Sequence, residues 1–230
     1  MSSTVGGDVA RAVARGLGQA LITFGVVLLL FVVYELKVTN LVTEREQDRL
    51  SAELEQAWAQ PTPAPEQGLQ PVAVEMGSGI AVIRIPRLGD DYAKVVVEGT
   101  DVDDLKKGPG RMVHTAQPGA IGNTVISGHR TTYGAPFERL DELQPGDAVV
   151  LETRDTWFTY RVTGTEIVAP TAIEVTYPVP GRLGAGPSKR LLTLTTCHPR
   201  FSARERMVVF GELETALPKA DGAPPALTEA

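Results

Sequence analysis

The sequence predicts a mainly β fold, a closed barrel of about eight strands with short helices, preceded by one transmembrane helix. Three observations lead to this architecture. Between residues 80 and 213, short β-branched runs alternate with Gly, Pro and Asp, the pattern of strands separated by turns. Few stretches of that region have helical periodicity. Near the N-terminus, a long apolar run supplies the membrane segment.

The composition excludes several functions before any motif is considered. The chain has 230 residues, of which 43% are hydrophobic, so it is not a disordered protein. Its formal net charge of -6 argues against a nucleic-acid partner, because neutralising phosphates requires clustered Lys and Arg. A single Cys excludes an internal disulfide framework and a multi-Cys zinc site. Since the other common metal and nucleotide motifs are missing too, we expect no metal and no cofactor.

The N-terminal part predicts a membrane anchor over residues 16–36, after a cytoplasmic tail of residues 1–15. From Gly16 to Tyr34 there are 19 residues without a charge, and about 20 helical residues cross a hydrocarbon core of about 30 Å. A cleaved signal peptide and a buried core helix are the alternatives. A signal peptide normally has a shorter apolar region and a small-x-small cleavage site close behind it. Basic residues flank the run almost equally, so charge favours a cytoplasmic N-terminus only slightly.

Three further segments flank the predicted domain, which covers residues 80–213. Residues 37–59 lack Gly and Pro and are rich in Glu, Gln, Arg and Leu, which predicts a solvated helical stalk. A dimerising coiled coil is the alternative, although the segment is too short for several clean heptads. Residues 60–79 contain four Pro and predict an extended linker. The Ala- and Pro-rich, acidic residues 214–230 predict a disordered tail.

Apolar runs within the domain identify its elements. In 157–163, Phe158, Tyr160 and Val162 occupy every second position, the period of a half-buried strand. Two short helices are predicted, at 101–106 and 135–142, and the Asp residues of the first are interpreted as helix-start residues. The predicted strands are 80–86, 94–98, 123–127, 147–152, 157–163, 164–168, 172–177, 190–196 and 206–213.

Cys197 carries the strongest chemical signal in the domain. It follows the apolar run 190–196, and Pro199 prevents a regular continuation, so the thiol is predicted at a strand end on the surface. A free Cys is more often a small buried hydrophobe. Here its neighbours Thr196 and His198 are polar, and an unpaired thiol outside the cytoplasm is at risk of oxidation. We therefore predict that Cys197 is a nucleophile.

A thiol nucleophile needs a base or a cation beside it. His129 is the preferred base, because it follows the apolar run 124–127 and the adjacent Gly128 permits a tight bend. His198 is next to Cys197, but neighbours in an extended chain point to opposite faces. His114 lies in a predicted loop. Both remain alternatives to His129.

Arg206 is the predicted third member of the site. It opens the run 206–213, nine residues after Cys197. If the strands 190–196 and 206–213 pair antiparallel, Arg206 lies beside Cys197, where a guanidinium can stabilise the oxyanion formed by thiolate attack. Arg200 and Arg204 are interpreted as solvated loop cations, and a surface cation is the alternative for Arg206 itself.

Three features together resemble the sortases, which are membrane-anchored cysteine transpeptidases of Gram-positive bacteria. They are the sequence TLTTCHP, the Arg206 that follows it and the upstream SGHR. GHRTTYGAPF together with TLTTCHP is similar to the class E sortases of high-GC actinobacteria. The resemblance covers residues 79–213 and implies a sortase-type β-barrel. It assigns Cys197 as nucleophile, His129 as acid and base, and Arg206 as the cation for the oxyanion or the substrate. Arg111-Met112 departs from the His-Tyr pair expected in many class E relatives.

The resemblance also implies a reaction and its partners. A sorting signal of the LPxTG or LAxTG type on a secreted protein would be cut between Thr and Gly through a thioester. A peptidoglycan precursor amine, or another pilin, would then receive the acyl group. Tyr133, Thr196 and the loop 178–189 are the candidates for binding the peptide. The anchor would lie in the lipid bilayer, with the N-terminus cytoplasmic and the catalytic domain extracytoplasmic.

Two other functions remain open from the residues alone. The first is a hydrolytic surface cysteine peptidase that uses the same three residues with water as the acceptor. The second is a non-enzymatic anchored β-domain in which Cys197 is inert. An amine-dependent product would separate the first from a transpeptidase, and the reactivity of the thiol in the folded protein would test the second.

Overall fold

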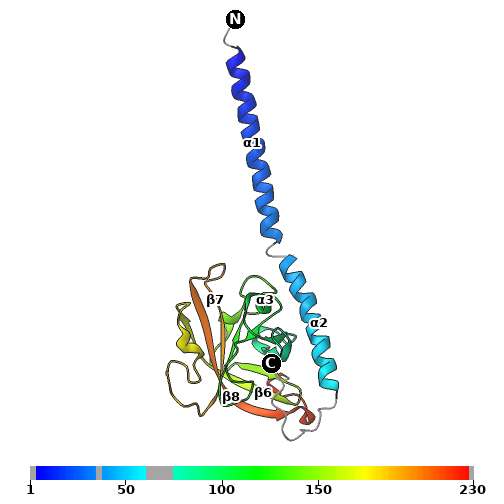
Figure 1. The fold of residues 1–230 in the computed structure, drawn as a ribbon, viewed down its shortest axis with the longest axis vertical. Helices are drawn as coiled ribbons and strands as arrows, with labels where there is room; N and C mark the ends of the chain where they lie inside the picture. The colour runs from blue at the N-terminus through cyan, green and yellow to red at the C-terminus, as the bar shows by residue number, and fades with distance from the viewer. Residues whose placement is uncertain (1–3, 35–37, 61–74, 228–230) are drawn as a thin grey trace. The chain divides into compact units, whose positions relative to one another are not determined.

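The computed structural model describes residues 4–34, 38–60 and 75–227, and the chain divides into two compact units, Met1–Thr39 and Asn40–Ala230. The first unit contains helix α1, Thr4–Val33 (Figure 1). Within it, Arg11–Val33 is long and apolar enough to cross a membrane, with a mean hydropathy of 2.3 and no part of the apolar window buried. Residues 35 and 36 of the predicted anchor, and most of the predicted linker of residues 60–79, lie outside the described residues.

In the described part of the second unit, eight strands close into a barrel in the order β1-β2-β3-β4-β7-β8-β6-β5. The pairs β2–β3 and β4–β7 are parallel, and the other pairs are antiparallel. Because β4 and β7 run in the same direction, their C-terminal ends meet at one edge of the barrel. The strands are β1 Gly79–Arg84, β2 Ala93–Glu98, β3 Gly110–Arg111, β4 Gly122–Ser127, β5 Ala148–Glu152, β6 Thr156–Val168, β7 Arg190–His198 and β8 Glu205–Pro218.

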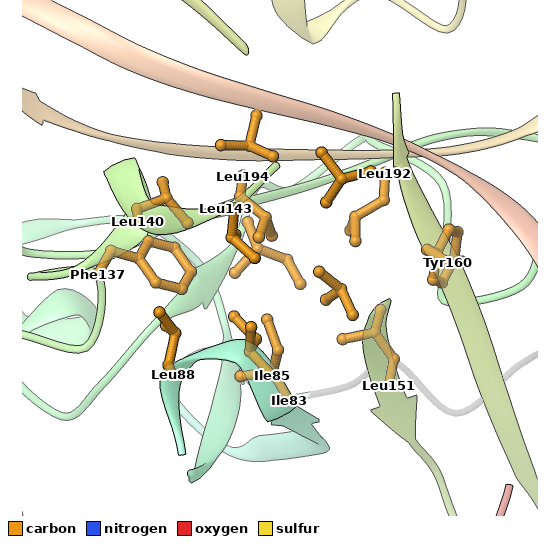
Figure 2. Packing of buried hydrophobic residues seen from close by; sticks show 14 of the residues in the cluster. Ile83, Ile85, Leu88, Phe137, Leu140, Leu143, Leu151, Tyr160, Leu192 and Leu194 are labelled. Atoms are coloured by element: carbon orange, nitrogen blue, oxygen red, sulfur yellow. The ribbon is translucent and has the colours of Figure 1, made fainter. Parts of the chain in front are cut away.

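Aliphatic side chains fill the interior of the barrel. Ile83, Leu151 and Leu192, from three different strands, point into one cluster, and Phe137 and Leu140 from the β4–β5 connection pack against them (Figure 2). All five side chains are fully or almost fully buried. Burying an aliphatic or aromatic side chain of this size contributes about 1.5–3 kcal/mol. The cluster therefore holds the strands and the β4–β5 connection together.

The predicted closed barrel is confirmed, with three differences in its strands. Residues 172–177, predicted as a strand, instead form the 3-10 helix η4, Ile173–Thr176. The two-residue strand β3 was not predicted, because so short a run has no periodicity to detect. The predicted strands 157–163 and 164–168 are one strand, β6, which continues past an irregularity in its pairing with β8 between Val162 and Gly164.

The two predicted short helices are shorter than expected. Helix α3 covers Val102–Leu105, and Asp101 and Asp104 form a reciprocal capping box at its start, which confirms their interpretation as helix-start residues. In the predicted helix 135–142, only Leu140–Glu142 is helical, as the 3-10 helix η3. Ala135 has a φ of 40°, a left-handed conformation that a regular right-handed helix cannot contain.

Helix α2, Thr39–Ala59, packs on the outside of the barrel, so the prediction of a solvated stalk was wrong. Its residues Leu50 and Leu54 are buried against Val82, Val95 and Val97 of β1 and β2. These valines point outward from the barrel, and α2 shields their apolar side chains from water. The apolar stripe of α2 is narrow, and nothing in the sequence identifies the strand face that it covers.

The predicted disordered tail, residues 214–230, was wrong for residues 214–227. Strand β8 extends to Pro218, and the short 3-10 helices η5, Lys219–Asp221, and η6, Pro225–Leu227, follow it. The ammonium of Lys219 lies 2.7 Å from the carboxylate of Glu152 and 4.4 Å from the ring centre of Trp58. Paired contacts of this kind hold the C-terminal segment to both the barrel and α2.

Candidate active site

Cys197 and Arg206 lie opposite each other on neighbouring strands. Strands β7 and β8 pair antiparallel, and their register places Cys197 directly across from Arg206. Directly opposed residues project from the same face, with Cβ atoms about 4.5–5.5 Å apart. The thiol of Cys197 is free, and the residue is half-buried. The prediction that antiparallel pairing brings Arg206 beside Cys197 is confirmed.

His129 reaches the same end of the barrel along strand β4. The parallel register of β4 and β7 places Ser127 beside Thr195. Beyond this pair, the N–H of Gly128 donates to the carbonyl of Thr195 at 3.1 Å, so the two chains stay together. His129 lies two residues after Ser127, and Cys197 lies two residues after Thr195. The parallel pairing thus brings the predicted base and the predicted nucleophile to adjacent strand ends.

The imidazole of His129 is half-buried and lies against an aromatic ring. Its ring centre is 4.9 Å from that of Tyr133, with the planes tilted by 44°. Burial lowers the pKa of His129 below its usual value, because removing the ring from water disfavours its charged form. At neutral pH the imidazole is therefore uncharged and can accept a proton.

The guanidinium of Arg206 is held at the start of β8. Its Nη1 donates to the carbonyl of Ala203 at 3.1 Å and to that of Glu205 at 3.0 Å. Ala203 belongs to the turn that joins β7 to β8, and Glu205 is the first residue of β8, so these bonds hold the guanidinium at the junction of the turn and the strand. A guanidinium has five N–H donors, so one nitrogen can be held by the turn while the others bind a substrate oxygen.

Arg130 is a site residue that was not predicted from the sequence. Its side chain is buried, its Nη1 lies 2.8 Å from Nδ1 of His198, and its Nη2 lies 3.1 Å from the carboxylate of Asp141. Because a guanidinium can only donate, Nδ1 of His198 is the acceptor in this contact. His198 thus anchors Arg130, which agrees with our preference for His129 as the base. The SGHR motif was the available signal, since it places Arg130 directly after His129.

Thr196 faces the inside of the barrel. The residue is 3% exposed, and its hydroxyl donates to the carbonyl of Gly128 at 2.8 Å. Its neighbour Cys197 projects to the opposite face, as successive residues of a strand do. The expectation that Thr196 binds the peptide stays a prediction. The hydroxyl ties β7 to the end of β4, next to His129.

A hollow of about 730 Å³ lies on the outer face of the barrel, under the connection between β6 and β7. It is lined by strands β6, β7 and β8 and by much of the predicted peptide-binding loop 178–189. Val168, a lining residue at the C-terminal end of β6, is paired with Arg206 in the β6–β8 register. The hollow therefore includes a residue on the strand next to Arg206. Apolar residues give it a surface suited to an extended peptide, namely Val168, Val175, Val179, Leu191 and Phe210.

His114 lies away from this strand end. It is in the β3–β4 connection, whose backbone amides bond to the carbonyls of Val125 and Asn123. Asn123 is near the start of β4, whereas His129 follows the end of that strand. In the described part of the chain, no group of three His, Cys, Asp or Glu residues is arranged to hold a metal ion. The structure thus favours neither a base role nor a metal-ligand role for His114.

Arg111, which departs from the pattern of many class E sortases, has a structural partner. It forms a buried ion pair with Glu98, with Nε donating to a carboxylate oxygen at 2.8 Å, and its Nη1 donates to the carbonyl of Thr115 at 2.6 Å. Glu98 and Arg111 are also paired in the β2–β3 register. The ion pair therefore joins two strands that share very few backbone contacts.

Comparisons with known proteins place the chain in a family. The family described as "Sortase domain" matches residues 83–214. Sortase SrtE1 of Streptomyces coelicolor is 34% identical over 93% of this chain, and Sortase SrtE2 of the same organism is 32% identical over 90%. The chain covers 61% of the length of SrtE1 and 84% of the length of SrtE2.

Solved structures lead to the same family. Sortase E from Streptomyces avermitilis is 44% identical, with a TM-score of 0.61, and the match covers 66% of this chain and 99% of that one. The SrtF sortase from Corynebacterium diphtheriae is 32% identical, with a TM-score of 0.66 and coverage of 74% and 100%. Sortase E1 from S. coelicolor, solved with a tripeptide in its active site, is 38% identical, with a TM-score of 0.61 and coverage of 66% and 97%.

The fold and these matches define the class of protein as a sortase built on a closed β-barrel. The chain belongs to the sortase family of cysteine transpeptidases. Its Streptomyces relatives are sortases E, which agrees with the class that GHRTTYGAPF and TLTTCHP indicate.

Proposed function

We propose that this protein is a membrane-anchored transpeptidase that cleaves an LPxTG- or LAxTG-like sorting signal between Thr and Gly and joins the new carboxyl end to a cell-wall amine. One observation carries the proposal. Cys197 and Arg206 are directly opposed on β7 and β8, and His129 follows the end of the adjoining strand β4. A thiol, an uncharged imidazole and a fixed guanidinium are the groups that acyl transfer through a thioester requires.

The first half of the reaction forms an acyl-enzyme. The neutral imidazole of His129 takes the thiol proton while Sγ of Cys197 attacks the Thr carbonyl carbon of the sorting signal. The carbonyl oxygen becomes an oxyanion, which accepts hydrogen bonds from the guanidinium of Arg206. When the intermediate collapses, the bond to the Gly nitrogen breaks, and His129 returns the proton to that amine. The lowered pKa of His129 supports this sequence, because the ring must be uncharged before attack.

The second half transfers the acyl group to an amine. A primary amine of a peptidoglycan precursor enters where the Gly end has left, and its nitrogen attacks the thioester carbonyl. His129 accepts the excess proton from the amine and passes it to Sγ as the C–S bond breaks, which restores the thiol of Cys197 and the neutral imidazole. Arg206 stabilises the second oxyanion as it did the first. The product is a secreted protein joined by an amide bond to a cell-wall precursor.

The substrates also define the proposed location. Secreted proteins that bear sorting signals, and precursors that carry the acceptor amine, meet at the outer face of the membrane. We infer that α1 crosses the bilayer with the N-terminus in the cytoplasm and the barrel outside. Protease added to intact cells should then digest the chain beyond about residue 40, the start of the second unit. Full protection of the barrel in intact cells would contradict this topology.

A peptide assay on the full chain tests the proposed reaction. The protein in detergent micelles is incubated with LPxTG and LAxTG peptides, with and without glycine peptides or diamino acids as acceptors. We expect a thioester mass on Cys197 and a ligated product whose yield rises with amine concentration. The Cys197→Ala variant should form neither.

The assay also separates the proposed function from the alternatives. A hydrolysed peptide whose yield ignores the amine would identify a peptidase and refute the transpeptidase. If no peptide is processed and a thiol-reactive probe does not label Cys197 in the folded protein, the Cys is inert and the enzymatic function is refuted.

A further inference from the structure

The loop that follows His129 has a strained apex. Within residues 130–136, the three consecutive residues Tyr133, Gly134 and Ala135 have φ angles of 51°, 73° and 40°. For residues with a side chain this left-handed region is disfavoured, and such a conformation persists only where the surroundings impose it. The ring of Tyr133 is the one that lies against the His129 imidazole. Whatever imposes the apex conformation therefore also determines the surroundings of His129.

Two hydrogen bonds fix the ends of this loop. The N–H of Phe137 donates to the carbonyl of His129 at 3.0 Å, which closes the loop at its base. The hydroxyl of Tyr92 donates to the carbonyl of Pro136 at 2.6 Å. These contacts set where the loop starts and ends. Neither of them involves the apex.

The apex is held by helix α2. The side-chain Oδ1 of Asn40, in the first turn of α2, accepts a hydrogen bond from the N–H of Gly134 at 2.9 Å. A Cβ placed on Gly134 would come within 3.1 Å of Cγ2 of Thr43, so the loop and the helix are in close contact there. The hydroxyl of Thr43 in turn donates to the carbonyl of Lys106 at 2.7 Å.

Helix α2 is itself fixed firmly enough to serve as a support. The side-chain amide of Gln47 pairs with strand β2 as another strand would, since its Oε1 accepts from the N–H of Val95 at 2.7 Å and its Nε2 donates to the Val95 carbonyl at 3.1 Å. The same nitrogen donates to the carbonyl of Lys107 at 2.8 Å. Further along the helix, Leu50 and Leu54 are buried against the barrel. The helix therefore has a defined register on the domain.

We propose that the first turn of α2 supports the catalytic site, with Asn40 as a positioning residue that acts through Gly134 and Tyr133 to hold His129. The segment between the membrane helix and the barrel thereby determines the turnover of the enzyme. This inference rests on the proposed function, because it assigns to His129 the proton transfers of that reaction. Acid–base transfer requires heavy atoms within about 2.6–3.2 Å, and a displacement of about 1 Å can cost about 10²-fold in rate.

Three variants of the full chain in detergent micelles test the proposal. Asn40→Ala removes the acceptor, and we expect kcat to fall about tenfold with little change in KM, because the substrate contacts remain. Asn40→Asp keeps an acceptor oxygen and should restore most of the turnover. Arg45→Ala alters an exposed residue of the same helix and should match the wild type. A kcat of Asn40→Ala equal to that of the wild type would overturn the proposal.

A fourth variant separates positioning from general loosening of the helix. Leu54→Ala weakens the packing of α2 at the end away from Asn40, so it should lower the Tm while leaving kcat near the wild-type value at temperatures well below the transition. An equal loss of kcat in Leu54→Ala and Asn40→Ala would show that only overall stability matters, which would refute the positioning role.

Hydrogen exchange measured by mass spectrometry distinguishes this inference from the proposed function. In Asn40→Ala, amide exchange should rise in residues 130–137 and stay unchanged in residues 190–198. This result would support the contact even if the wild type processed no sorting peptide, in which case the proposed function fails instead. Unchanged exchange in residues 130–137 would refute the inference, whatever the activity of the wild type.

Discussion

Truncating Leu50 tests whether α2 belongs to the folded domain. Leu50 is 2% exposed and packs with Leu54 against three outward-facing valines of β1 and β2. A buried Leu→Ala change costs about 2–5 kcal/mol. This cluster is small and one-sided, so we take a value near the lower end, about 2.5 kcal/mol. In a protein of this size each kcal/mol lowers the Tm by about 2–4 °C. Leu50→Ala should therefore lower the Tm by about 5–10 °C.

The assay is thermal unfolding of the full chain in detergent micelles, followed by intrinsic tryptophan fluorescence. Trp58 of α2 and Trp157 of β6 both lie within cation–π distance of Lys219, so the signal reports on the helix and the barrel together. Leu41→Ala is the matched control, since Leu41 is on the same helix but 54% exposed, and should change the Tm by less than about 1–2 °C. An unchanged Tm in Leu50→Ala would refute the packing of α2 and restore the solvated stalk.

Three further predictions concern the site. Arg206→Lys keeps the net charge but loses the forked donor, so peptide turnover should fall by about 10²–10³-fold. The control Arg204→Lys should keep a turnover close to that of the wild type. Equal turnover in the two variants would refute the oxyanion role of Arg206. Arg130→Met should lower the Tm by about 4–8 °C, because a buried charged hydrogen bond is worth about 2 kcal/mol, and a Tm within about 1 °C of the wild type would show that the contact between Arg130 and His198 does not stabilise the fold. Because burial lowers the pKa of His129, its contribution to native stability is fully present above about pH 6.5 and is lost as the pH falls through the folded-state pKa, since the unfolded chain takes the proton first. Between about pH 7.5 and pH 5.5 the wild-type Tm should thus drop more than that of His129→Gln, and parallel curves would contradict a buried neutral ring.

The predicted features that the structure confirmed depend on short-range patterns. A charge-free run long enough for a membrane identifies α1, and period-two alternation between turn residues identifies most strands of the barrel. The opposition of Cys197 and Arg206 was also predictable, because the short connection between β7 and β8 makes them antiparallel neighbours. In each case the deciding information lies within a few tens of residues, which is the range over which sequence constrains structure directly.

Tertiary structure alone decided which faces meet. Helix α2 was predicted to be a solvated stalk and the Ala- and Pro-rich C-terminal segment to be disordered. Instead, the outward-facing valines of β1 and β2 pack against α2, and the ion pair of Lys219 joins the C-terminal segment to the barrel. The inward direction of Thr196 follows from the register of β7 with β4, and the contact of Arg130 with His198 follows from the meeting of two strand ends far apart in the chain. The residues that flank each of these positions in the sequence do not indicate which partner it will contact. The contacts form because burying apolar surface and pairing charges lower the free energy only once the barrel has closed.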